Sequence, residues 1–313
     1  MRQEEQQYRS GVALALGNFD GLHRGHASVL AAAKAQAESL RLTPGVLLFD
    51  EHPKQVLCGE APPLLMTGEE KRARLESAGF TVLTLPFRKI RDLSPAAFLS
   101  LLETAYGVRA VSCGSNYRFG QNAAGTADTL RDLCLQYEMT LTVVPDALYK
   151  NERISSTRIR RAIEDGDMAD ANAMLLFPFS YALPVIAGDK RGRRLGFPTL
   201  NQLFPTALIR PRAGVYASFA SFDGNRYPSV TNVGVRPTIG GTGFYSETHI
   251  FDFSGDLYGK TVEVTLLAFL RDEQKFKDLA ALRAAMENDA ARAKEVIHRY
   301  EQTTEAASEG SLL

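Results

Sequence analysis

In the first half of the chain, short apolar runs alternate with longer amphipathic segments. The apolar runs predict strands at residues 12–16, 45–49, 81–85, 108–113 and 140–144. The intervening pattern predicts helices at residues 27–42, 68–78, 95–106 and 126–137, and a last short helix that ends near residue 176. Strands that alternate with helices are typical of a doubly wound parallel sheet, whose ligands bind beyond the carboxyl ends of the strands.

The pattern changes after the break at Phe177-Pro178-Phe179. Short alternating runs, separated by Gly, Pro, Asn and Asp, then predict strands at residues 181–187, 215–222, 227–235, 247–253 and 261–270. Such strands favour a small antiparallel β-barrel, and residues 276–300 predict a long amphipathic helix that caps it. We therefore expect two domains, residues 1–178 and 179–313.

The composition is that of a soluble globular protein, with 45% hydrophobic and 23% charged residues. Lys+Arg 36 balance Asp+Glu 36, so nothing indicates bulk attraction to nucleic acid or membrane. The polar beginning lacks the apolar core of a signal peptide, and the three cysteines lack metal-ligand spacing. We expect a cytoplasmic protein with small-molecule ligands, no nucleic-acid or membrane partner, and self-association left open.

A glycine-punctuated turn joins the first predicted strand to the first predicted helix. Such a turn presents the free N–H groups of a helix N-terminus to an anion. His23 and His26 lie three residues apart there, so both imidazoles can face one bound group, whereas a lone histidine is more often structural. This pattern predicts a nucleotide site. Its candidate phosphate-binding residues are Gly17, Asn18, Phe19, Asp20 and Gly21.

Two later segments of the first half are predicted to reach the same site. Asn116 follows a strand, although a surface turn is the alternative for its segment, residues 114–120. Hydroxyl side chains enter the helix that carries Arg160, and these are Ser155, Ser156 and Thr157. Capping alone would explain the hydroxyls, but it does not require the arginine.

In the second half, residues 188–201 combine four basic residues with glycines, which suits a polyphosphate unless they form a solvated face. The candidate phosphate-binding residues here are Gly188, Arg191, Gly192 and Gly196. Pro198 fixes the backbone, so Thr199 and Asn201 can project oxygen ligands. The glycine-rich residues 234–243 predict a loop leading to Glu247, a carboxylate that opens a strand. The Gly-x-x-x-x-Gly-Lys-[Ser/Thr] pattern of a P-loop is absent from the sequence.

The string His23-Arg24-Gly25-His26 resembles the signature of the nucleotidyltransferase superfamily, which includes the class I aminoacyl-tRNA synthetases. With residues 18–21, 116–120 and 155–160, the first half is similar to the Rossmann-like adenylyltransferase part of the bacterial bifunctional riboflavin kinase/FMN adenylyltransferases, or FAD synthetases. The second half resembles their riboflavin kinase module, at residues 196–201, 232–238, 256–260 and 270–276. Two positions depart from the family pattern, Leu200 where alanine is usual and Asp272 where proline is common.

The resemblance implies two ATP-dependent reactions, riboflavin to FMN and FMN to FAD, both assisted by Mg²⁺. It implies that Thr199 and Asn201 hold Mg²⁺–nucleotide and that Glu247 is the base for the ribityl hydroxyl, which must lose a proton. The phosphate of FMN needs no base, so His23 and His26, with Arg160, would stabilise charge on the phosphates. Asn116 and Arg271 are assigned to the flavin, although a surface ion pair is an alternative for Arg271.

Two other function classes stay open at this point. One is a different nucleotidyltransferase or synthetase-like enzyme with an RNA-binding barrel, which the zero net charge and the lack of a basic aromatic face disfavour. The other is a non-catalytic flavin-binding protein, which the presence of both histidines and Glu247 disfavours.

Overall fold

A computed structural model describes residues 11–188, 196–238 and 241–308 of the chain. The contacts divide the chain into two compact units, Met1–Ser156 and Thr157–Leu313. The sequence predicted a boundary at 178 instead. The difference concerns α7 (Ser156–Asp165) and α8 (Met168–Met174), which group with the second unit except for Ser156. One reason is Asn172 of α8, whose side-chain nitrogen donates to the Leu266 carbonyl of the second unit's sheet (3.0 Å).

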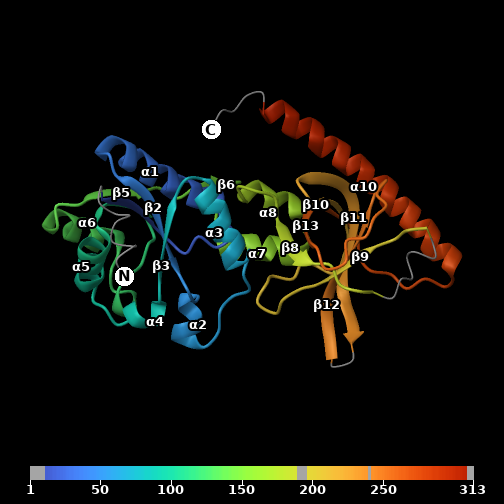
Figure 1. Cartoon of the computed structure of the whole chain (residues 1–313), viewed down its shortest axis with the longest axis horizontal. Coiled ribbons are helices and arrows are strands. Elements are labelled where there is room, and N and C mark those ends of the chain that lie inside the picture. Colours follow the sequence, from blue (N-terminus) through green and yellow to red (C-terminus); the bar gives the residue numbers. More distant parts are fainter. Residues whose placement is uncertain (1–10, 189–195, 239–240, 309–313) are drawn as a thin grey trace. The chain divides into compact units, whose positions relative to one another are not determined.

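The first unit is built on a parallel sheet with strand order β3-β2-β1-β4-β5 (Figure 1). In chain order the strands are β1 (Val12–Leu16), β2 (Thr43–Phe49), β3 (Thr81–Leu85), β4 (Val108–Gly114) and β5 (Thr140–Val144). The order reverses between β1 and β4, which neighbour each other in the middle of the sheet. The doubly wound parallel sheet expected from the sequence is confirmed, and its strand positions agree within two residues.

The helices of this unit are α1 (Arg24–Leu40), α2 (Pro53–Cys58), α3 (Gly68–Ser77), α4 (Phe87–Ile90), α5 (Pro95–Tyr106) and α6 (Ala127–Gln136). A short 3₁₀ helix (Gln121–Ala123) and a hairpin of β6 (Leu148–Tyr149) and β7 (Glu152–Arg153) complete it. Ser94 caps α5 and Thr126 caps α6, each by accepting a backbone N–H. The sequence missed α2 and α4, because four to six residues show no helical periodicity.

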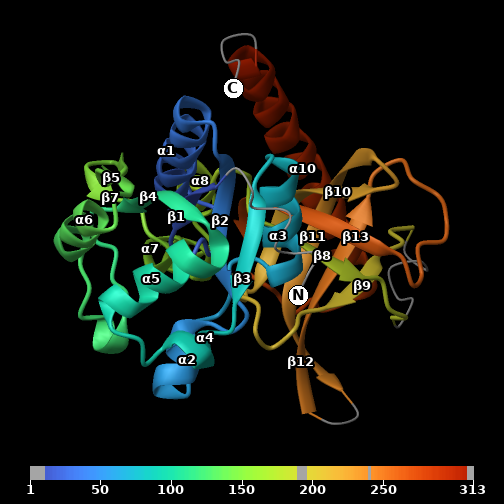
Figure 2. The same cartoon turned by 60° about the vertical axis from the view of Figure 1, so that its left-hand side comes forward.

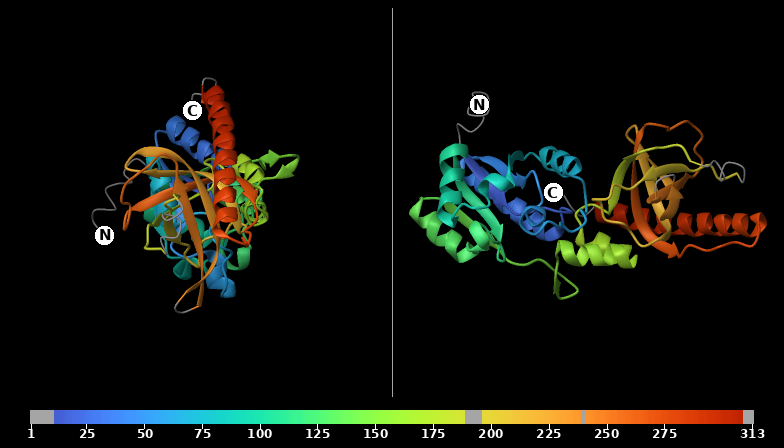
Figure 3. Two further views of the ribbon diagram at one scale, coloured as in Figure 1. Left: turned by 90° about the vertical axis from the view of Figure 1, so that its right-hand side faces the viewer. Right: turned by 90° about the horizontal axis from the view of Figure 1, so that it is seen from below.

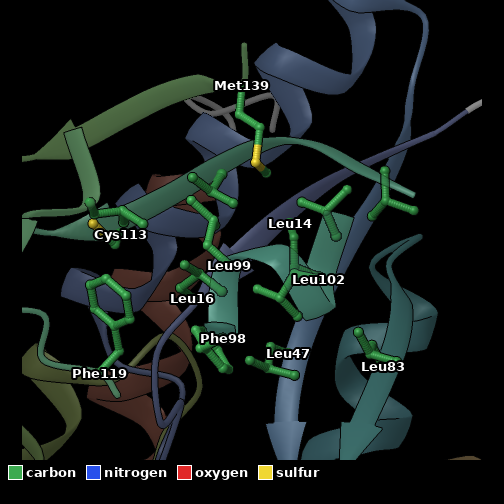
Figure 4. Packing of buried hydrophobic residues seen from close by; sticks show 14 of the residues in the cluster. Leu14, Leu16, Leu47, Leu83, Phe98, Leu99, Leu102, Cys113, Phe119 and Met139 are labelled. Atoms are coloured by element: carbon green, nitrogen blue, oxygen red, sulfur yellow. The ribbon is translucent and has the colours of Figure 1, made fainter. Parts of the chain in front are cut away.

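Strand β1 is buried on both faces, and its residues alternate in size. The larger Leu14 and Leu16 face the side covered by α5, where they pack with Phe98, Leu99 and Leu102 (Figure 4). On the other face the smaller Ala13 and Ala15 contact α1, whose Ala33 and Ala37 are also buried. Small residues on both sides let α1 lie close to the sheet, which fixes the helix N-terminus just beyond the end of β1.

The second unit contains an antiparallel sheet with strand order β8-β13-β10-β11-β12-β9 (Figure 2). The strands are β8 (Ser180–Pro184), β9 (Leu200–Leu203), β10 (Gly214–Phe222), β11 (Asn225–Thr238), β12 (Gly241–Ile250) and β13 (Thr261–Arg271). The edges approach each other through a bridge between Ile186 and Asn201. Inside, the Gln202 amide donates to the Leu183 and Val262 carbonyls, so the sheet curls into a near-barrel, as the sequence predicted.

Helix α10 (Leu279–Ser308) lies along this sheet (Figure 3). Its Ala293 and Ile297 pack with Val215 and Phe219 of β10. The sequence predicted a helix at 276–300. The observed start is later because Asp278 accepts the backbone N–H of Ala281, as an N-cap does, and the helix continues past residue 300.

The loop predicted at 234–243 is wrong over most of its length. Strands β11 and β12 pair there, with Gly234 opposite Tyr245 and Arg236 opposite Gly243. Glycine-rich sequence favours a loop, but the antiparallel ladder accommodates these glycines, and the hairpin projects beyond the other strands (Figure 2). Glu247 therefore lies within β12 rather than at the start of a strand.

Candidate active sites in the two units

The first candidate site begins with two histidines that cap α1. His23 is the N-cap residue; its Nδ1 accepts the backbone N–H of His26 (3.2 Å), and its own N–H donates to Nδ1 of His26 (3.3 Å). The two rings stack with centroids 3.5 Å apart. Because each Nδ1 accepts a hydrogen bond, each neutral ring carries its hydrogen on Nε2. The pair therefore presents two Nε2–H donors away from the helix end.

Burial keeps both rings neutral. Desolvation lowers the pKa of His23 from 6.5 to about 4. Desolvation, the neighbouring His23 ring and the Lys71 ammonium lower the pKa of His26 well below its ordinary value. Both imidazoles are thus neutral hydrogen-bond donors at neutral pH.

The glycine turn ahead of these histidines is held by its own buried residues. Phe19 adopts a left-handed backbone (φ 50°), and its fully buried ring lies 5.1 Å from the His26 ring, beneath Gly17. A Cβ at Gly17 would lie 3.1 Å from the Phe19 ring, so glycine is favoured there. Asp20 is buried and accepts the Leu65 N–H (3.1 Å). The side chains of Phe19 and Asp20 therefore stabilise the turn from inside the protein. The backbone of the turn is then the part that can contact a ligand.

Asn18 is contacted by two residues that the sequence did not single out. His52 caps α2 through Nδ1, which accepts the Lys54 N–H (3.1 Å). Its Nε2 lies 3.1 Å from the side-chain nitrogen of Asn18. From α3, Lys71 Nζ donates to the Asn18 carbonyl (3.2 Å).

Two further predicted segments lie at the same sheet edge. Asn116 is exposed in the loop after β4, next to Ser115, whose backbone N–H donates to Val144 at the end of β5. Ser156 Oγ donates to the Asp20 carbonyl (2.9 Å), which ties the start of α7 to the glycine turn. Ser155 is half-buried and Thr157 exposed. Arg160 is buried on α7, within the second unit.

The second candidate site is a cavity of about 640 Å³ in the barrel unit. Thr199, Asn201 and Thr248 line it, together with apolar residues such as Ile250 and Leu257. His249 Nδ1 lies 2.9 Å from the Pro198 carbonyl and fixes the segment that carries Thr199. Gly188 also lines the cavity, and a Cβ there would overlap the Asn201 amide, so glycine permits this packing.

Glu247 lies in β12 directly opposite Asn201 of β9 and Asn232 of β11. Paired residues of an antiparallel ladder share a face, so these three side chains project on one side of the sheet. Arg236 forms an ion pair with Glu247, and its Nη1 lies 3.5 Å from Asn201 Oδ1. Asn232 donates to Glu273, while its buried Oδ1 has no hydrogen-bond partner in the described part of the chain. The cluster thus joins a carboxylate to polar groups that can receive a ligand.

Arg271 forms an ion pair, but this pair is mostly buried and does not lie on the surface, as the alternative from the sequence had it. Its Nε and Nη2 donate to the Asp289 carboxylate of α10 (2.8 and 2.7 Å), and both side chains are mostly buried. Nη1 donates to the Asp272 carbonyl (2.9 Å). Gly196 has a left-handed backbone (φ 87°) that favours glycine. Arg191 and Gly192 lie outside the described residues.

Sequence reasoning missed Lys71, His52 and Arg236 as neighbours of the two sites. His52 follows a predicted strand at the ligand edge, and that position could have indicated it. Lys71 gave no signal, because it stands among other charged residues of a polar helix. Among the described residues, no group of three or more His, Cys, Asp or Glu could hold a metal ion. In the same part of the chain, none of the helices has the length and apolar character needed to cross a membrane.

Family models match both halves of the chain. The model described as FAD synthetase matches residues 5–158, and the model described as riboflavin kinase matches residues 175–297. The first match contains both histidines, and the second contains Thr199, Asn201 and Glu247.

Curated relatives match nearly the whole chain. It is 34% identical to the bifunctional riboflavin kinase/FMN adenylyltransferase of Pseudomonas fluorescens over 288 residues, which covers 91% of this chain and 92% of the relative. The enzyme of the same name from Bacillus subtilis (strain 168) is 34% identical, with the same coverage. That of Escherichia coli (strain K12) is 33% identical and covers 92% of this chain and 93% of the relative.

A solved structure is also similar, the crystal structure of a macrolide-efflux protein from Streptococcus pneumoniae. The TM-score is 0.84 at 30% sequence identity, and the match covers 91% of this chain and 94% of that chain. The two folds therefore agree over almost their full lengths.

Proposed function

The chain belongs to the family of bifunctional riboflavin kinase/FMN adenylyltransferases, and we propose that each of its two candidate sites performs one of the two reactions. The enzyme converts riboflavin and ATP to FMN and ADP, and FMN and a second ATP to FAD and pyrophosphate. In this proposal residues 1–178 carry out adenylyl transfer and residues 179–313 phosphorylate riboflavin. The protein acts on small molecules in the cytoplasm, without a nucleic-acid or membrane partner.

The reciprocal capping of His23 and His26 is the observation that carries the assignment of adenylyl transfer. The nucleophile is a phosphate oxygen of FMN, already an anion, so the reaction needs placement and stabilisation of charge rather than a base. The two Nε2–H groups donate to the phosphates at the α-phosphorus, and the N-terminus of α1 adds its partial positive charge. The turn residues 17–21, with Ser155, Ser156 and Thr157, bind the phosphates, Arg160 assists, and Asn116 contacts the flavin.

In the second unit, Glu247 accepts the proton of the terminal ribityl hydroxyl as that oxygen attacks the γ-phosphorus of ATP. The buried, unpartnered Oδ1 of Asn232 supports this placement, because it is an acceptor for a hydroxyl on the same face as Glu247. Arg236, the ion-pair partner of Glu247, provides a positive charge beside this carboxylate. Gly188, Arg191, Gly192 and Gly196 bind the nucleotide phosphates in this proposal, and Arg271 contacts the flavin.

Mg²⁺ fits the donor set at Thr199 and Asn201. Both residues line the cavity and offer neutral, hard oxygen atoms, which suit Mg²⁺ delivered with the nucleotide phosphates better than Mg²⁺ held by protein alone. The ion would neutralise charge on the transferred phosphoryl group. The two residues orient the nucleotide at the cavity wall.

The kinase assignment is tested with Glu247→Gln, which keeps the shape of the side chain but removes the base. FMN formation from riboflavin should fall by about 10²-fold or more, while FAD formation from supplied FMN is unchanged. Chromatography of flavin products separates the two steps. Glu295→Gln, an exposed change on α10, is the matched control and should leave both steps intact.

The adenylyltransferase assignment is tested with His23→Ala combined with His26→Ala. This protein should convert riboflavin to FMN and stop there, since each lost donor costs about 10²–10³-fold. His298→Ala on α10 is the control. If either set of variants lost both activities together, or the histidine variant made FAD at the parental rate, the assignment of one reaction to each site would be wrong.

A further inference from the structure

Lys71 reaches the first site from an element that carries none of the residues assigned to it. Helix α3 begins after Thr67, whose hydroxyl caps it by accepting the Glu70 N–H. One turn later the half-buried Lys71 extends to the glycine turn, where Nζ donates to the Asn18 carbonyl (3.2 Å). The ammonium therefore lies at the end of β1, where ligands of such sheets bind.

The neighbouring basic residues of α3 behave differently. Arg72 pairs with Glu76 (3.1 Å), and Arg74 pairs with Glu70 (2.8 Å). Lys71 forms no ion pair with any residue that the structure describes, and its described hydrogen bond goes to a neutral carbonyl. An ammonium has three donors. The charge of Asp20 favours the charged form of Lys71, but the desolvation of the ammonium outweighs it. Partly desolvated charges of this kind are concentrated at functional sites.

The charges of the neighbouring groups indicate a role for the positive charge of Lys71. Lys71 lies close enough to His26 to lower the pKa of that imidazole, and desolvation lowers the pKa of Lys71 itself. Since His23 and His26 are neutral, they supply donors but no formal charge. The triphosphate of ATP and the departing pyrophosphate carry several negative charges, which neutral donors do not neutralise. Lys71 offers that positive charge within the same unit.

We propose that Lys71 binds the phosphate groups at the first site, with one donor holding the Asn18 carbonyl and the others directed to the pyrophosphate part of the nucleotide. This inference rests on the proposed function of that site. Lys71 thereby joins the histidines as a residue for adenylyl transfer. The histidines contribute neutral hydrogen-bond donors, and Lys71 contributes a positive charge.

The test compares Lys71→Met, which removes the charge at similar length, with Lys71→Arg, which keeps it. Lys71→Met should lower kcat/KM for FAD formation by about 10²-fold and weaken binding of inorganic pyrophosphate about tenfold, measured by calorimetry. Lys71→Arg should restore most of the pyrophosphate binding. Riboflavin phosphorylation by the same proteins reports folding and should be unchanged. Lys89→Met, at an exposed position of α4, is the matched control.

Binding of pyrophosphate by Lys71→Met as tightly as by the parent would overturn the inference, because a residue that only braces Asn18 does not contact the anion. An equal loss in Lys71→Met and Lys71→Arg would also contradict a role through charge. The histidine double variant distinguishes a failure of the proposed adenylyl-transfer site from a failure of the role of Lys71. If it loses FAD formation while Lys71→Met does not, the site stands and only the role of Lys71 fails.

Discussion

At the scale of single residues, the first site depends on two histidines that are each other's helix cap. The contact uses both Nδ1 atoms, so it selects the tautomer in which both Nε2 atoms are donors. Burial then keeps the rings uncharged. Sequence spacing predicts that the imidazoles are close, but the tautomer and the protonation state depend on the hydrogen bonds and on desolvation.

This arrangement makes stability depend on pH. The pKa of His23 is about 4 in the folded chain and about 6.5 when unfolded, so the unfolded state takes up the proton first as the pH falls. The contribution is fully present above pH 6.5 and is lost between pH 6.5 and about 4. It amounts to something on the order of 3 kcal/mol. Urea denaturation of the parent and of His23→Asn, which keeps an N-cap acceptor, should show a smaller acid-induced loss in the variant. Parallel pH curves for the two proteins would contradict this.

At the scale of elements, the first site lies in the loop between strand β1 and helix α1. The cluster around Glu247 lies on the neighbouring strands β9, β12 and β11. The first unit could be predicted well because its buried strands are apolar runs and its longer helices are periodic and capped. In the second unit β9 and the outer part of the β11–β12 hairpin were missed, because Gly, Pro and Asn look like loop residues when their cross-strand partners are unknown.

The candidate residues also divide into those that a local pattern indicates and those that only the fold brings together. Those carried by motifs, such as His23, His26 and Asn201, could be found because they lie in strings of fixed spacing. Lys71 and His52 approach Asn18 from α3 and from the cap of α2, and only the folded sheet brings these segments together. Contacts of this kind depend on tertiary structure, which local patterns do not encode.

The packing of Gly188 against Asn201 gives a prediction at this scale. In Gly188→Val the new side chain would occupy the position of the Asn201 amide and displace it from the cavity wall. We expect riboflavin phosphorylation to fall by about tenfold or more, because a small misplacement of a nucleotide ligand is costly. FAD formation from FMN should be unchanged. Ala182→Val, at an exposed position of β8, is the matched control. Normal kinase activity in Gly188→Val would argue against Asn201 as a ligand.

At the scale of the whole molecule, the chain holds two units with separate cores. Leu14, Phe98 and Leu102 belong to the core of one, and Phe219 and Ile297 to that of the other. The neutral histidine pair and the carboxylate cluster lie in different units, and each suits a different nucleophile. In the proposed function FMN is the product of one site and the substrate of the other, so the two activities should be separable by substitution and should recombine.

The most direct test mixes two variants that each lack one reaction. Glu247→Gln alone should leave riboflavin unchanged, and the His23→Ala, His26→Ala protein alone should accumulate FMN. With riboflavin, ATP and Mg²⁺ in one tube, the mixture should produce FAD, because FMN released by the second protein is adenylylated by the first. Failure of the mixture to produce FAD, while each variant is folded and retains its remaining activity, would contradict two independent sites.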